Sequence, residues 1–274
     1  MTKQAITRRT ALGAAVGAAA IATSISTRAL AQTDTRKTFV LVHGAWHGGW
    51  CWRLVADALC AHGHRIFTPT LTGLGERKHL LSREITLATF IDDLTNLIEM
   101  EELQAIILVG HSHGGSVISG VADRMPDRIA HLVRLDAVVL QDGQSPFGVL
   151  PPEVAAERRR LVAEQGLGLA IPVPPVTAFG IAEDHPRAAW VRRHLTPHPV
   201  GTYESALRLN HPVGNGRPRT YIHCTNPVYD AIAGSRNWVR GQPGWEWRDI
   251  ATAHDAMVTA PAELTQMLLV IGVH

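Results

Sequence analysis

Short apolar runs alternate with segments of helical periodicity along most of the chain, and this alternation restricts the fold more than any other feature. A helix between two successive strands returns the chain to the same end of the sheet, so the strands run parallel and helices cover both faces. The run AIILVG at 105–110 is apolar throughout, which is typical of a strand buried on both faces. The sequence therefore predicts an α/β fold with a mostly parallel central sheet. The expected strands are 38–42, 65–69, 105–110, 129–140, 219–225 and 245–251, and the expected helices are 52–64, 87–102, 116–125, 229–240 and 261–272.

Residues 141–217 interrupt this alternation. The segment is rich in proline, glycine and arginine, and it carries helical stretches such as EVAAERRRLVAEQ at 153–165. We expect an inserted, mainly helical cap over the sheet; the alternative is a surface excursion without a role. With the cap inside it, 32–274 is expected to form one domain, because its length suits a single large core.

The first 31 residues differ from the rest and are typical of a signal peptide. They carry basic residues, a short Ala/Gly-rich apolar run and a small-residue cleavage pattern at 29–31, and the pair Arg8-Arg9 resembles a twin-arginine signal. We expect an exported protein, periplasmic or secreted, by the twin-arginine or the Sec route; the alternative is a membrane-anchoring helix. Without the four basic residues of this segment, the chain has 22 basic and 24 acidic residues, a net charge of −2. That charge predicts no nucleic-acid partner, and no membrane insertion of the mature chain is expected.

A glycine-rich turn directly follows the strand expected at 105–110. Its sequence, GHSHG at 110–114, is G-x-S-x-G between an expected strand and an expected helix. Small residues two positions before and after the serine allow a sharp, strained turn that exposes the hydroxyl. The alternative is an ordinary glycine-rich turn, but the strand–turn–helix context favours Ser112 as a nucleophile.

A serine hydroxyl becomes a good nucleophile only when a base takes its proton. His254 follows the last expected strand, so it should lie at the same end of the sheet as Ser112. His111 and His113 are closer in sequence, but neighbours on a sharp turn point away from the serine. We therefore expect His254 to be the base, with Asp255 facing away from its Nδ1.

Acyl transfer at a serine also needs donors for the oxyanion. One candidate is the N–H of His113, at the start of the helix after the turn. The other is the N–H of Ala45, in the loop HGAWHGGWCW after the first expected strand. The alternative for this loop is an ordinary strand-ending turn.

The chain from about residue 38 to its end resembles the α/β-hydrolases of the hydroxynitrile lyase and plant methyl-esterase branch, which includes bacterial esterases. The matching stretches are FVLVHGAWHGGWCW, GHSHGGSVIS, LVRLDAVVLQDGQS, TYIHCT and HDAMVTAP, and the order nucleophile, acid, histidine is also that of the family. The resemblance implies a capped α/β-hydrolase domain and acyl chemistry without a cofactor, on a small-molecule ester.

The acid of the expected triad departs from the family pattern. Most members carry it in the loop after the next-to-last strand, where this chain has Pro227. Some α/β-hydrolases carry it at the end of the strand after the nucleophile helix, and this chain has Asp136 there. A carboxylate at an apolar strand end needs a partner, and the His254 imidazole would be one. We expect Asp136 to be the acid; the alternatives are Asp230, Asp142 or no acid at all.

Together these residues predict a serine esterase that cleaves small, largely apolar carboxylic esters by a Ser-His-Asp acyl-enzyme mechanism. The alternatives are a hydroxynitrile lyase-type C–C lyase and an amide or carbamate hydrolase. Lyases of the branch have threonine and lysine where this chain has Gly44 and Asp255, which favours the hydrolase. A non-catalytic binding protein would be expected to have lost the serine or the histidine.

The substrate pocket is expected to be apolar and lined by Trp46 and Trp190, although such tryptophans more often pack in a core. The sequence has no evident basic cluster near the site, which favours neutral esters over charged ones. No metal site is expected, because the histidines of HGH and HSH lack a third ligand at workable spacing. No oligomeric state is predicted.

Overall fold

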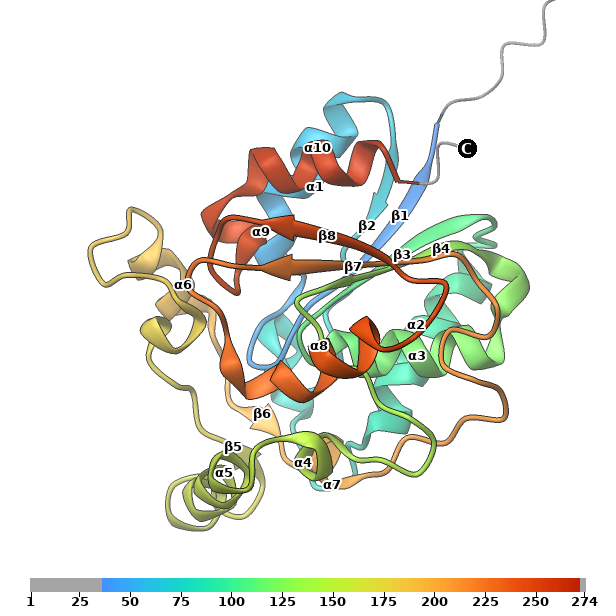
Figure 1. Cartoon of the computed structure of the whole chain (residues 1–274). Helices are drawn as coiled ribbons and strands as arrows, with labels where there is room; N and C mark the ends of the chain where they lie inside the picture. The colour runs from blue at the N-terminus through green and yellow to red at the C-terminus, as the bar shows by residue number, and fades with distance from the viewer. Residues whose placement is uncertain (1–35, 272–274) are drawn as a thin grey trace, which may run out of the picture. The chain divides into compact units, whose positions relative to one another are not determined.

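The computed structural model describes residues 36–271, so the expected signal peptide lies outside the described residues. Six parallel strands form the central sheet in the order β2-β1-β3-β4-β7-β8 (Figure 1). The parallel sheet predicted from the alternation is confirmed. The strands are β1 (Thr38–Val42), β2 (Arg65–Phe67), β3 (Ile106–His111), β4 (Ile129–Leu135), β7 (Arg219–Cys224) and β8 (Glu246–Ile250).

The strand expected at 129–140 is shorter in the structure, where β4 ends at Leu135. Asp136 has φ 40°, in the left-handed region, and a strand cannot continue through that conformation. The apolar residues after it are buried as a loop. The prediction of a longer strand was wrong because burial alone does not distinguish a buried loop from a strand.

Helices cover both faces of the sheet (Figure 1). α1 packs against α10, and α2 packs against α3. α2 begins after Thr86, whose side chain and that of Thr89 cap each other's backbone N–H groups. The helices are α1 (Arg53–Ala61), α2 (Leu87–Met100), α3 (Gly114–Arg124), α8 (Ala233–Arg240), α9 (Ala256–Thr259) and α10 (Pro261–Leu269), with the 3₁₀ turns η1 (Gly49–Trp52), η2 (Gly75–Leu80), η3 (Pro126–Arg128) and η5 (Asp230–Ile232).

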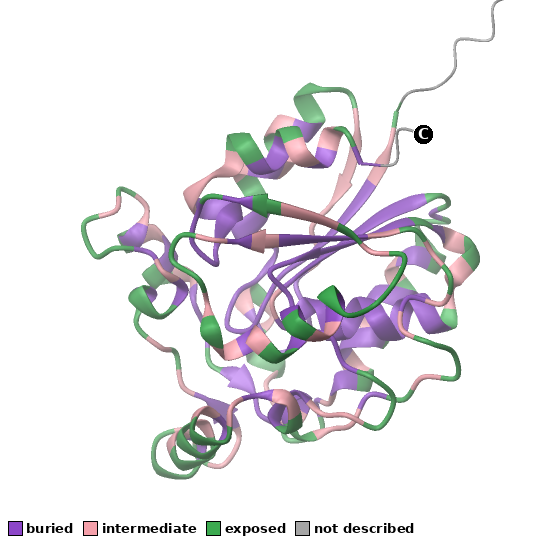
Figure 2. Ribbon diagram, viewed as in Figure 1, coloured by how far each residue is buried: buried purple, intermediate pink, exposed green. Residues whose placement is uncertain are grey.

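The sheet separates two large apolar cores, and Val139, Tyr221 and Val239 form a small third cluster. Along β1, Phe39 and Leu41 belong to one core, and Val40 and Val42 belong to the other. All four are fully buried, and Figure 2 shows the central strands buried along most of their length. This two-sided burial explains why the strands read as continuous apolar runs.

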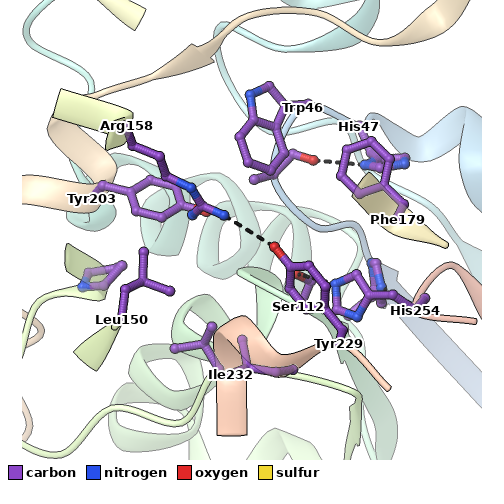
Figure 3. A pocket seen from close by; sticks show the side chains of 14 residues that line it. Trp46, His47, Ser112, Leu150, Arg158, Phe179, Tyr203, Tyr229, Ile232 and His254 are labelled. Atoms are coloured by element: carbon purple, nitrogen blue, oxygen red, sulfur yellow. Dashed lines mark hydrogen bonds between the residues drawn. The ribbon is translucent and has the colours of Figure 1, made fainter. Parts of the chain in front are cut away.

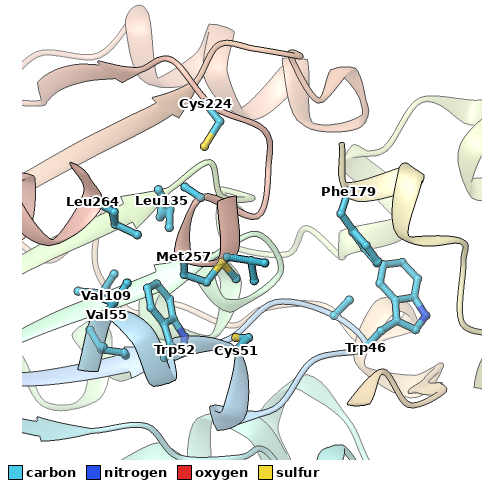
Figure 4. Packing of buried hydrophobic residues seen from close by; sticks show 14 of the residues in the cluster. Trp46, Cys51, Trp52, Val55, Val109, Leu135, Phe179, Cys224, Met257 and Leu264 are labelled. Carbon is cyan, nitrogen blue, oxygen red and sulfur yellow. The ribbon is translucent and has the colours of Figure 1, made fainter. Parts of the chain in front are cut away.

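The first core anchors the loop after β8 (Figure 4). Trp52 from η1 and Met257 from α9 are both fully buried, and Val109 of β3 and Leu264 of α10 belong to the same cluster. Each fully buried large apolar side chain stabilises the fold by about 1.5–3 kcal/mol. Burial of Met257 therefore fixes the chain three residues after His254.

Residues 141–217 leave the central sheet and form short helices and a two-stranded antiparallel sheet, β5 with β6. The expectation of helical pieces here is confirmed, and the helix expected at 153–165 spans Pro152–Glu164. The expected domain boundaries stay a prediction. The elements are α4 (Pro146–Val149), α5 (Pro152–Glu164), β5 (Ala170–Ile171), η4 (Val176–Phe179), α6 (Ala188–His194), β6 (His198–Pro199) and α7 (Gly201–Glu204). Among the helices of residues 36–271, none is long and apolar enough to cross a membrane.

Candidate active site

Ser112 lies at the turn between β3 and α3, with φ 50°. This left-handed conformation is strained for a residue with a side chain. A Cβ at Gly110 would lie 2.7 Å from the Gly114 carbonyl oxygen, and a Cβ at Gly114 would lie 2.8 Å from the His43 carbonyl oxygen. Both positions therefore require glycine, which is the steric reason for the G-x-S-x-G pattern.

The loop after β8 brings His254 to the serine (Figure 3). His254 Nε2 lies 2.9 Å from Ser112 Oγ, and His254 Nδ1 lies 2.7 Å from Asp136 Oδ2. The imidazole is almost fully buried, and the carboxylate is completely buried. The three side chains thus form one hydrogen-bonded chain from three separate strand ends.

Of the three candidate acids, the structure brings only Asp136 to His254. Its second carboxylate oxygen lies 3.7 Å from the Arg236 guanidinium, which helps to offset the buried charge. The Asp230 side chain is 92% exposed, beside Arg236, and Asp142 accepts a hydrogen bond from the N–H of Leu209. Neither alternative has a contact with the imidazole.

The two expected oxyanion donors lie beside Ser112. Ala45 lines the same cavity as the serine, and His113 directly precedes α3. Among the hydrogen bonds within residues 36–271, none is donated by either backbone N–H. Buried N–H groups are rarely left without a partner, so both are suited to a ligand oxygen. The His113 ring is buried and stacks on Tyr203, and burial, with smaller effects of Arg158 and His43, lowers its pKa to about 3.

A narrow cavity covers the serine hydroxyl (Figure 3). Its volume is about 10 Å³, and it lies between the strand ends and the 141–217 segment. Nine of its fourteen lining residues are aromatic or aliphatic, and the other five are Ser112, Arg158 and three histidines. The lining residues are Ala45, Trp46, His47, His111, Ser112, Val138, Pro146, Leu150, Arg158, Phe179, Tyr203, Tyr229, Ile232 and His254.

The two tryptophans expected in the pocket differ in position. Trp46 lines the cavity, and its Nε1–H donates to the Ile171 carbonyl. Trp190 does not line the cavity; it packs edge-on against Trp50 at 5.0 Å and also contacts His194. The expectation for Trp190 was wrong because its ring packs with Trp50 and His194 against the first core and does not face Ser112.

Sequence reasoning missed Arg158, a charged residue in the cavity wall. It belongs to the run RRR at 158–160, whose other members, Arg159 and Arg160, are exposed, so nothing in the run itself indicates that one arginine lines the cavity. Burial tends to lower the pKa of Arg158, but contacts with Tyr203 and Tyr229 offset this effect and raise the pKa. The guanidinium therefore stays charged in a wall whose other polar residues are Ser112 and three histidines.

A second buried pair lies behind the serine. His47 Nε2 lies 3.0 Å from Asp255 Oδ2, both side chains are almost fully buried, and His47 Nδ1 lies 2.7 Å from the Ala45 carbonyl. Asp255 faces away from the Nδ1 of His254, as the sequence predicted. The pair joins the Ala45 loop to the loop of His254, so it fixes two parts of the site relative to each other.

Replacing Asp255 by asparagine is expected to lower the free energy of unfolding by about 3–5 kcal/mol, because it leaves the His47 charge buried without a partner. Urea unfolding would measure this loss. The matched control is Asp249→Asn, because that carboxylate is 57% exposed and contacts His223 at 3.1 Å. We expect the control to cost no more than about 1 kcal/mol.

The pKa values of His47 and Asp255 predict how the loss of unfolding free energy in Asp255→Asn depends on pH. Burial lowers the pKa of His47, but the charge of Asp255 and its hydrogen bond more than offset this effect and raise the pKa above 6.5. Burial raises the pKa of Asp255, but His47 more than offsets it, so the pKa lies below 3.8. The pair is therefore fully stabilising between pH 3.8 and 6.5 and weakens as the pH leaves that window on either side. An equal loss at pH 5 and pH 9 would contradict the ion pair.

Comparison with known proteins gives consistent matches. The model of the alpha/beta hydrolase family matches residues 39–266. The carbendazim hydrolyzing esterase of Nocardioides sp. is 42% identical, over 85% of this chain and 99% of that protein. Putative methylesterase 12 of Arabidopsis thaliana is 30% identical, over 86% of this chain and 72% of that protein. An extracellular alpha/beta-hydrolase from a Paenibacillus species, with homology to tobacco salicylic acid binding protein 2, aligns with a TM-score of 0.74 and 25% identity, over 85% of this chain and 98% of that one.

Proposed function

The chain belongs to the alpha/beta hydrolase family and is a carboxylic ester hydrolase of its plant methylesterase-like branch, and we propose that it cleaves small, largely apolar esters through an acyl-enzyme on Ser112. The observation that carries this proposal is the hydrogen-bonded chain from Asp136 through His254 to Ser112, with distances of 2.7 and 2.9 Å. The chain ends at the Ser112 hydroxyl, which lines the cavity.

The geometry supports a two-step acyl transfer. Ser112 Oγ attacks the ester carbonyl carbon while His254 Nε2 takes the hydroxyl proton, and the imidazolium then protonates the departing alcohol. Water repeats the sequence on the acyl-enzyme and releases the acid. Asp136 holds the imidazole in the tautomer that presents Nε2 to the serine, and its charge stabilises the imidazolium.

The negative charge that develops on the carbonyl oxygen would be held by the N–H groups of Ala45 and His113. Hydrogen bonds that form only as charge develops lower the barrier without tightening substrate binding. The start of α3 adds the positive end of the helix dipole at the same point.

The substrate class follows from the cavity walls and from one relative. Aromatic and aliphatic side chains make up most of the lining, which favours apolar acyl and alkyl groups. A second candidate is a carbamate ester, because a relative that matches along nearly its whole length is a carbendazim hydrolyzing esterase. Both reactions use the same nucleophile and oxyanion donors.

Hydrolysis of a small substrate panel tests this proposal. The purified protein is expected to release p-nitrophenol from p-nitrophenyl acetate and butyrate with kcat of about 1 s⁻¹ or more. Loss of carbendazim on incubation with the protein, followed by liquid chromatography, decides between a strict ester preference and carbamate activity. Cleavage of mandelonitrile without ester hydrolysis would instead identify a C–C lyase and overturn the proposal.

A further inference from the structure

A second pocket lies next to the catalytic cavity. It has a volume of about 500 Å³ and is formed mainly by α5 and the proline-rich segment before η4. Four residues line both spaces: Trp46, Arg158, Phe179 and Tyr229. They therefore form a partition between the serine and this outer pocket.

The sizes of the two spaces show that an ester cannot occupy the catalytic cavity as it stands. A volume of about 10 Å³ holds no more than one water molecule. The outer pocket has the volume that small-molecule sites generally have, about 300–1,000 Å³. Its walls include Val154, Leu161 and Ile171, whereas its acidic residues, Glu153 and Glu157, are exposed.

Three of the four partition residues are held by neighbouring groups. The Trp46 indole donates to the Ile171 carbonyl, and the Tyr229 ring stacks on His254 with ring centres 4.0 Å apart. Phe179 is buried and packs against Trp46 at 5.7 Å. Trp46 and Tyr229 are therefore fixed by contacts with residues outside the partition, and Phe179 is fixed by the Trp46 ring.

Arg158 is held differently. Its guanidinium donates to the Tyr229 hydroxyl at 3.2 Å and lies over the rings of Trp46 and Tyr203. Among the described residues no acidic side chain pairs with it. Of the partition residues it has the longest and most flexible side chain, and its contacts are with tyrosine hydroxyls and ring faces rather than with a carboxylate, so it is the easiest to displace.

We propose that the outer pocket is the subsite for the larger apolar half of the ester, and that Arg158 is the specificity-determining residue that closes the way to Ser112 until this group displaces it. This inference rests on the proposed function. The substrate class is an ester with a small group on one side of the scissile carbonyl and a ring-sized apolar group on the other. The small group stays beside Ser112, and the ring enters the space between α5 and the proline-rich segment.

The test compares kcat/KM for 2-naphthyl acetate and for ethyl acetate, and uses their ratio. Arg158→Met keeps an extended apolar side chain but removes the hydrogen bond to Tyr229. The ratio is expected to rise about fivefold or more, because displacement no longer breaks that bond. The control is Arg159→Met on the same helix, which removes an exposed arginine that lines neither pocket and should leave the ratio at the wild-type value.

A second variant narrows the outer pocket without touching Arg158. Ala178 is exposed at the pocket wall, so Ala178→Trp can fold and would fill part of the space. The ratio is expected to fall about tenfold. Its control is Ala156→Trp, at an exposed position of α5 outside the pocket.

The results of these assays distinguish a failure of the proposed ester hydrolysis from a failure of the proposed role of the outer pocket and Arg158. A wild-type protein that hydrolyses neither ester overturns the proposed function and this inference with it. Hydrolysis of both esters, with wild-type ratios in Arg158→Met and Ala178→Trp, overturns the inference alone. Opposite shifts of the ratio in the two variants, with wild-type ratios in both controls, support it.

Discussion

Replacing Ser112 by alanine is expected to lower kcat/KM for p-nitrophenyl acetate by about 10⁵-fold or more, to a small residual rate from the oxyanion donors alone. The loss is this large because, of the residues that line the cavity, Ser112 alone has a hydroxyl bonded to an imidazole. The Ser112 hydroxyl is bonded to His254 at 2.9 Å, and removing it leaves the base without a proton to accept.

The matched control is Ser116→Ala, two residues into α3. The Ser116 hydroxyl is completely buried and makes no hydrogen bond within the part of the chain that the structure describes. We expect this control to keep activity within about twofold of wild type, because it removes a group without a partner. Substantial activity in Ser112→Ala would contradict the proposed mechanism.

Replacing Asp136 by asparagine is expected to lower kcat by about 10³- to 10⁴-fold. An amide can hold the imidazole in the wrong tautomer and cannot stabilise the imidazolium. Asparagine tolerates the left-handed backbone at this position, so the fold should persist and the loss should be chemical. Thermal unfolding of the variant checks that point.

Asp230→Asn is the control for this substitution. Its carboxylate is 92% exposed and has no contact with His254, so activity should stay within about twofold of wild type. A large loss in Asp230→Asn, with wild-type activity in Asp136→Asn, would place the acid in the loop after β7 and contradict the assignment.

Much of the arrangement could be predicted from the sequence because it depends on local patterns. The apolar runs determined the parallel sheet, and a parallel sheet brings the turn after β3 and the loop after β8 to the same end. Ser112, His254 and Asp136 each directly follow a strand or lie in the loop after it. Their proximity therefore followed from chain order and strand direction.

The remaining features depend on packing between distant segments, which periodicity does not report. Arg158 reads as part of an exposed basic run, and only the packing of α5 over Trp46 and Tyr203 places it in the cavity wall. His47 and Asp255 are 208 positions apart, and neither has a local signal that predicts the other as its partner. Trp190 was misplaced for the same reason.

Covalent labelling shows whether Ser112 is the nucleophile of an acyl-transfer mechanism. A fluorophosphonate reacts with an activated serine, and mass spectrometry of the digested protein identifies the labelled residue. We expect one label per chain, on Ser112, and almost none in Asp136→Asn over the same time. Hydrolytic activity that survives complete labelling, or a label on a residue other than Ser112, would show that Ser112 is not the nucleophile.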